Sequence, residues 1–78
     1  MALKRSTLEA LAVPLNRRDF PAFVEAVGRL PASDRNILAV LGAGLLLMAA
    51  TGSRSFLRNA PAFTSWLADY QQTNVIDD

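Results

Sequence analysis

Apolar side chains recur at helical spacing along most of the chain, and proline or glycine separates one repeat from the next. The clearest stripe lies in residues 20–30, at positions i, i+3, i+4, i+7 and i+10: Phe20, Phe23, Val24, Val27 and Leu30. This spacing places the five side chains on one face of a helix, opposite Glu25 and Arg29. The pattern predicts an all-α fold, and without a flexible linker we expect one small domain over residues 1–78.

We expect four short helices, arranged around a central apolar helix that is the third in chain order. The first begins at Ser6, because Ser6 and Glu9 have the spacing of a capping box, in which each side chain satisfies a free backbone N–H. It ends by Val13, because Pro14 disfavours helical backbone in the residue before it. At about two turns, this helix is too short to be stable without a surface to pack on.

The second and fourth helices share a start signal, in which an Asx residue is followed two residues later by proline. Asp19 precedes Pro21 and Asn59 precedes Pro61, so we expect both Asx side chains to be N-caps. The apolar stripe of the fourth helix consists of Phe63, Trp66, Leu67 and Tyr70. No feature of the sequence tethers the polar tail, residues 71–78, so we expect it to lie free.

The third helix is predicted over residues 34–51, with Ser33 or Asp34 as its N-cap and Gly52 in the left-handed conformation that ends many helices. On a helical wheel, bulky aliphatic side chains cover about half of its circumference. The other half carries mainly small side chains: Ala39, Gly42, Ala43, Leu46, Ala49 and Ala50. This half would allow another helix to approach closely.

No charged residue occurs between Arg35 and Arg54, so the third helix has no charged face. The whole chain is 51% hydrophobic and 19% charged, with a mean hydropathy of +0.21, whereas soluble domains average about 25% charged residues. Two interpretations follow. Residues 36–53 would reach about 27 Å as a helix, close to the roughly 30 Å of a bilayer core, and would form a single membrane span. Alternatively, the helix is buried in a bundle or against a partner protein.

For a membrane span, the distribution of basic residues sets the orientation. Six Lys and Arg residues precede the segment and two, Arg54 and Arg58, follow it. The positive-inside rule then places the N-terminus in the cytoplasm. Trp66 and Tyr70 would lie at the outer membrane interface, where amphipathic aromatic rings settle.

The sequence offers no residues for common catalytic or metal chemistry. It contains no cysteine and no histidine, which removes thiolate chemistry, the usual general base and the commonest transition-metal ligand. The carboxylates lie at helix starts, on polar faces or in the tail. We therefore expect no enzyme activity, no cofactor and no metal site.

Nucleic acid is not an expected partner either. The net charge is +1, and a helix-turn-helix arrangement would use the third helix for recognition, which has no polar side chain after Asn36 to read a base edge.

The favoured function is that of a non-catalytic accessory subunit of a larger protein complex, associated with membrane lipid and packing its central helix on the complex or on itself. The predicted partner-interface residues are Ala39, Gly42, Ala43, Leu46, Ala50, Phe63, Trp66 and Tyr70. The alternatives are a soluble helical-bundle adaptor or inhibitor and a lysis or pore-forming peptide. Seven arginines against one lysine indicate a bacterial or phage genome, and hence the bacterial inner membrane or, for the soluble alternative, the cytoplasm.

Overall fold

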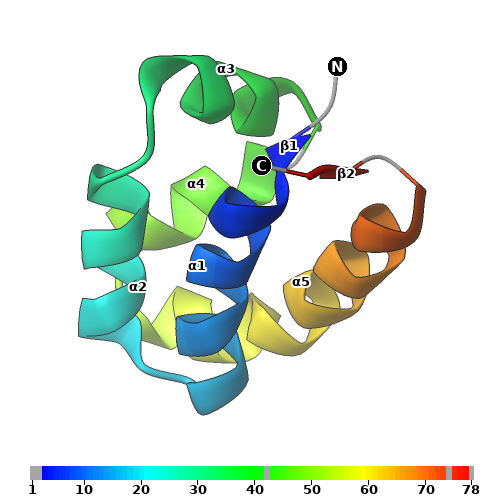
Figure 1. Ribbon diagram of the computed structural model, residues 1–78. Coiled ribbons are helices and arrows are strands. Elements are labelled where there is room, and N and C mark those ends of the chain that lie inside the picture. Colours follow the sequence, from blue (N-terminus) through cyan, green and yellow to red (C-terminus); the bar gives the residue numbers. More distant parts are fainter. Residues whose placement is uncertain (1–2, 42, 74, 78) are drawn as a thin grey trace.

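Five helices and one pair of two-residue strands make up the described part of the chain, residues 3–41, 43–73 and 75–77 of a computed structural model (Figure 1). The helices are α1 (Arg5–Arg17), α2 (Phe20–Gly28), α3 (Ala32–Leu41), α4 (Ala43–Thr51) and α5 (Ser53–Thr73). The strands are β1 (Leu3–Lys4) and β2 (Val75–Ile76). The predicted all-α class is confirmed.

The helices surround one hydrophobic core. Helices α1 and α4 each pack on both α2 and α5, and Figure 1 shows α1 in front of α4, with α3 crossing one end of the bundle. Every helix contributes a fully buried side chain, among them Leu11, Phe23, Leu38, Leu45 and Phe56. The ring of Phe56 lies 5.0 Å from that of Phe23, centroid to centroid, which fixes α5 against α2.

The predicted continuous helix over residues 34–51 is replaced by two helices, α3 and α4, whose axes differ by 106°. The sequence at this point contains Gly42 and Gly44, and glycine is among the weakest helix formers. The bend also directs Leu38 of α3 and Met48 of α4 into the same core, so both arms bury their bulky faces within this chain. Burial therefore favours the bend over the straight helix that the uncharged sequence suggested.

Among the described residues, no single helix is both long enough and apolar enough to cross a bilayer. The segments 32–40 and 44–51 reach the necessary length and hydropathy only when taken together, across the bend.

Three helix starts differ from the prediction. Helix α3 begins at Ala32, so Ser33 and Asp34 lie in its first turn and neither is its N-cap. Helix α1 begins at Arg5, with no side-chain cap, so the capping box is wrong. It continues through Pro14 to Arg17, since Leu15 extends the buried stripe and holds the last turn in the core. Helix α5 begins at Ser53, well before Asn59, its predicted N-cap.

The two predicted Asx caps have different outcomes. Asp19 is confirmed: its Oδ1 accepts a hydrogen bond from the backbone N–H of Ala22, at 3.2 Å. Asn59 is instead inside α5, where its side-chain amide donates to the carbonyl oxygen of Ser55 at 2.8 Å. Burial of Phe56 and Ala60 explains the earlier start of α5. Gly52, with φ +104°, has the predicted left-handed conformation.

The C-terminal segment is tethered, contrary to the prediction. Helix α5 continues to Thr73, and β2 then pairs in parallel with β1, which brings the two ends of the chain together (Figure 1). Arg5 Nε and Asp77 Oδ1 form an ion pair at 2.6 Å beside the strands. Leu3, which pairs with Val75, is fully buried. A strand pair formed by residues about 70 apart has no local signature in the sequence.

Candidate interaction surface

The structure separates the predicted partner-interface residues into several places. Ala39 is exposed on α3, Gly42 lies outside the described residues, and Ala43 begins α4 without a described side chain. Leu46 and Ala50 lie together on α4, lining one groove. On α5, Phe63 and Trp66 are half-buried and Tyr70 is buried.

The aromatic side chains of α5 make contacts within the chain. The rings of Trp66 and Tyr70 are 5.2 Å apart. Tyr70 belongs to the core, and Trp66 and Phe63 pack against it. These contacts favour a packing role over a free anchoring surface.

The groove that contains Leu46 and Ala50 lies between α2 and α4 and has a volume of about 330 Å³. Its walls are almost entirely small or aliphatic: Val24, Val27, Gly28, Leu46, Ala49 and Ala50, with Arg35 as the one charged residue among them. The Arg35 guanidinium donates to the carbonyl oxygens of Val27 and Gly28, at 3.3 and 3.2 Å. These bonds satisfy carbonyl groups at the end of α2 and hold the arginine against that end of the helix.

Two large aliphatic side chains at this part of the surface are exposed to solvent. Leu47 on α4 is 61% exposed and Val24 on α2 is 39% exposed. Leu47 and Ala50 are three residues apart on a helix and therefore lie on the same face. Because α4 contains no charged residue, its outward face is an apolar surface that nothing in the described chain covers. We call Leu47 together with the groove residues the α2–α4 surface.

Two glycines have contrasting roles at this part of the fold. A Cβ on Gly44 would lie 2.7 Å from Cζ of Phe63, so glycine permits α4 to pack closely on α5. A Cβ on Gly28 would meet nothing within 4 Å, because Gly28 faces the open groove. A methyl group at position 28 would therefore meet open space.

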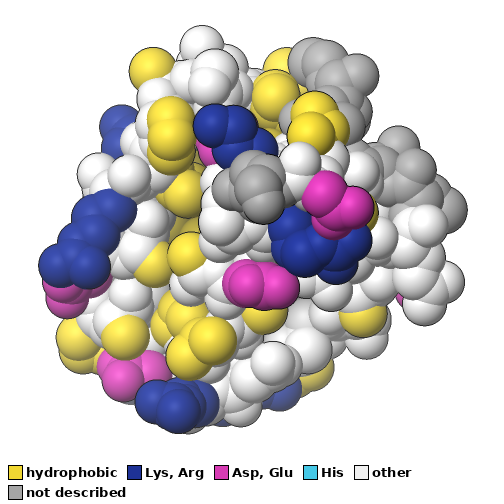
Figure 2. Space-filling model, in the orientation of Figure 1, with side chains coloured by type: hydrophobic (Ala, Val, Ile, Leu, Met, Phe, Trp, Pro, Cys, Tyr) yellow, Lys and Arg dark blue, Asp and Glu magenta, His cyan; other side chains and the backbone are white. Residues whose placement is uncertain are grey.

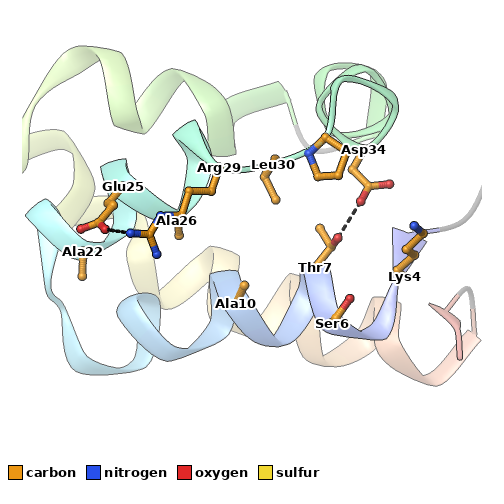
Figure 3. A pocket seen from close by; sticks show the side chains of 11 residues that line it. Lys4, Ser6, Thr7, Ala10, Ala22, Glu25, Ala26, Arg29, Leu30 and Asp34 are labelled. Atoms are coloured by element: carbon orange, nitrogen blue, oxygen red, sulfur yellow. Dashed lines mark hydrogen bonds and ion pairs between the residues drawn. The ribbon is translucent and has the colours of Figure 1, made fainter. Parts of the chain in front are cut away.

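A second, larger cavity of about 480 Å³ lies between α1, α2 and the start of α3. On the face of the molecule in Figure 2, hydrophobic side chains lie between α2 and α1, with charged side chains around them. Figure 3 shows two polar pairs at opposite ends of this cavity: Thr7 with Asp34, and Glu25 with Arg29. Thr7 Oγ1 donates to Asp34 Oδ2 at 2.6 Å, and Glu25 and Arg29 form an ion pair.

Four of the polar side chains that line the cavity are engaged with each other, as these two pairs. Thr7 and Asp34 are only 6% and 4% exposed, and no buried side-chain nitrogen or oxygen among the described residues lacks a hydrogen-bond partner. Side chains that are already paired offer a ligand few new bonds, and the bond between Thr7 and Asp34 ties α1 to α3. The described residues also contain no cluster of three or more Asp and Glu side chains that could hold a metal ion.

Sequence reasoning missed three features of these sites. The predicted stripe places Val24 and Val27 on one helix face with Phe23, yet both also line a groove, because only part of that face reaches the interior. Arg35 had no predicted role. Asp34 was interpreted as a helix cap, and its buried bond to Thr7, 27 residues away, has no signal in the sequence.

Comparisons with protein-family models, with curated proteins and with solved structures find no match to this chain.

Proposed function

We propose that the chain is a non-catalytic helical interaction module that binds another protein chain through the α2–α4 surface. One observation carries this proposal. A groove lined by small and aliphatic side chains shares α4, a helix without charged residues, with the exposed Leu47. Apolar surface exposed in a contiguous patch favours protein contact, because its burial releases free energy of about 25 cal/mol per Å².

The groove suits a helix or a large aliphatic side chain. Gly28, Ala49 and Ala50 allow close approach, and Val24 and Leu46 provide walls on α2 and α4. Arg35, the one charged lining residue, adds one point of polar contact. Interfaces commonly have such an arrangement, with an apolar centre and charge at the edge.

Site-specific photocrosslinking in the cells that make the protein tests this function. A photoreactive amino acid at position 47 should yield an adduct of defined mass, whereas the same residue at position 13 should not. Val13 is a suitable control because it is 50% exposed on α1 and lines neither the groove nor the cavity. No adduct at position 47, or equal adducts at both positions, would refute the proposal.

A second candidate is the membrane-associated accessory subunit, supported by one observation. The segments 32–40 and 44–51 together have the length and hydropathy of a span and are separated by a 106° bend. In this proposal, α3 and α4 leave the core on contact with lipid and straighten, with the N-terminus on the cytoplasmic side of a bacterial inner membrane.

Flotation with phospholipid vesicles separates the two candidates. An opened bundle would remain with the vesicles in high salt, because apolar burial, unlike surface ion pairing, is not screened by salt. If the protein does not float with the vesicles, the membrane-associated proposal is rejected and only the interaction module remains.

A further inference from the structure

The α2–α4 surface has a projection and a recess next to each other. Leu47 is exposed on α4, and Gly28, Ala49 and Ala50 are among the residues that line the open groove between α2 and α4. A cavity of about 150 Å³ is large enough to hold benzene. The groove, at about 330 Å³, therefore has ample room for a leucine side chain.

A surface of this kind is complementary to itself. In an interface with two-fold symmetry, the same patch is used on both copies, so a projection on one copy must meet a recess on the other. Two molecules related by such an axis near α4 would insert each Leu47 into the other copy's groove. Both contacts form at once, and no further partner is needed to cover the patch.

The charge distribution also suits two-fold pairing. Residues close to a two-fold axis meet their own copies, so a charged residue there would face a like charge, which costs several kcal/mol. Helix α4 carries no charge, and the uncharged run extends from Arg35 to Arg54. Arg35, the one charged lining residue of the groove, is engaged by the carbonyl oxygens of Val27 and Gly28 at the end of α2.

We infer that the partner of the α2–α4 surface is a second copy of this chain, which forms a two-fold dimer with Leu47 of each copy seated in the other's groove. The inference rests on the function proposed above and specifies its partner.

Sedimentation equilibrium of the full chain tests the inference with two variants that change opposite halves of the contact. Leu47→Glu replaces the projecting side chain with a charge. Gly28→Phe adds a large side chain at the groove, where a Cβ meets nothing within 4 Å, and circular dichroism checks that the variant folds. Each should weaken dimerisation about tenfold or more, as losses at central interface residues do. The control, Val13→Glu on α1, should leave the dimer unchanged.

Mixing the two variants provides a sharper result. A heterodimer of Leu47→Glu with Gly28→Phe restores one intact contact, Leu47 of the second variant in the open groove of the first. The mixture should therefore associate more strongly than either variant alone. If circular dichroism shows that Leu47→Glu does not fold, the comparison of dimerisation between the wild type and Gly28→Phe still tests the inference.

A wild-type chain that stays monomeric at millimolar concentration would overturn the inference, as would dimers that neither variant weakens. The proposed function has a separate readout. An adduct at position 47 with the mass of a different protein would retain that function and reject self-association, whereas no adduct would reject both.

Discussion

At the scale of single residues, local signals predict correctly where the chain has no competing tertiary contact. Asp19 caps α2 as expected, since it precedes a proline in an exposed connection. Asn59 has the same local sequence pattern, yet it lies inside α5 because Phe56 and Ala60 are buried on either side of it. The same pattern therefore has two outcomes, and the core decides between them.

The two Asx residues should differ in their effect on stability. Asp19→Ala removes a capping hydrogen bond and should lower the free energy of unfolding by about 0.5–2 kcal/mol. Asn59→Ala loses one side-chain bond to Ser55 but gains helix propensity, so its effect should be within about 0.5 kcal/mol. Urea denaturation of both variants checks this difference, and equal losses would contradict the helix boundaries.

Thr7 and Asp34 are a pair that no sequence pattern could reveal. Thr7→Val should cost about 1–3 kcal/mol, because it leaves a buried carboxylate without its hydroxyl donor. Thr7→Ser keeps the hydroxyl and should cost less. Chemical denaturation measures both, and an unchanged stability for Thr7→Val would show that the bond does not tie α1 to α3.

At the scale of elements, the hydrophobic periodicity correctly predicts helical structure and part of the buried faces, but it predicts neither the helix ends nor the division of residues 34–51 into two helices. The absence of charge between Arg35 and Arg54 suggested one straight helix. However, the absence of charge does not distinguish one helix that is buried all round from two helices that meet in a core. The pairing of β1 with β2 is equally invisible, since each strand has two residues. Nonlocal contacts account for both errors.

The packing of α4 on α5 predicts opposite effects for the same substitution at two glycines. Gly28→Ala should stabilise the chain by about 0.4–1 kcal/mol, because alanine restricts the unfolded state and meets open space in the folded one. Gly44→Ala should destabilise it by about 1–3 kcal/mol, since its methyl group displaces the ring of Phe63.

Thermal unfolding measures both glycine variants. Adding Phe63→Leu should relieve the defect of Gly44→Ala. A stabilising effect of Gly44→Ala on its own would contradict the close contact between α4 and α5.

At the scale of the whole molecule, the bend between α3 and α4 connects the fold to the proposed function. It places Leu38, Leu45 and Met48 in the core and leaves Leu47 outside. Of the interface predicted from sequence, only Leu46 and Ala50 come together at the groove, because its other wall is supplied by α2. A straight helix over residues 34–51 would abolish this surface.

The distance between spin labels on the two arms tests this account most directly. The chain has no cysteine, so labels can be attached to cysteines introduced at Ser33 and Thr51, both exposed. At 1.5 Å per residue, a straight helix separates these Cα atoms by about 27 Å, whereas the 106° bend brings them to about 16 Å. Pulsed electron resonance in solution should show the shorter distance. A distance near that of the straight helix would contradict the bent core and the α2–α4 surface together.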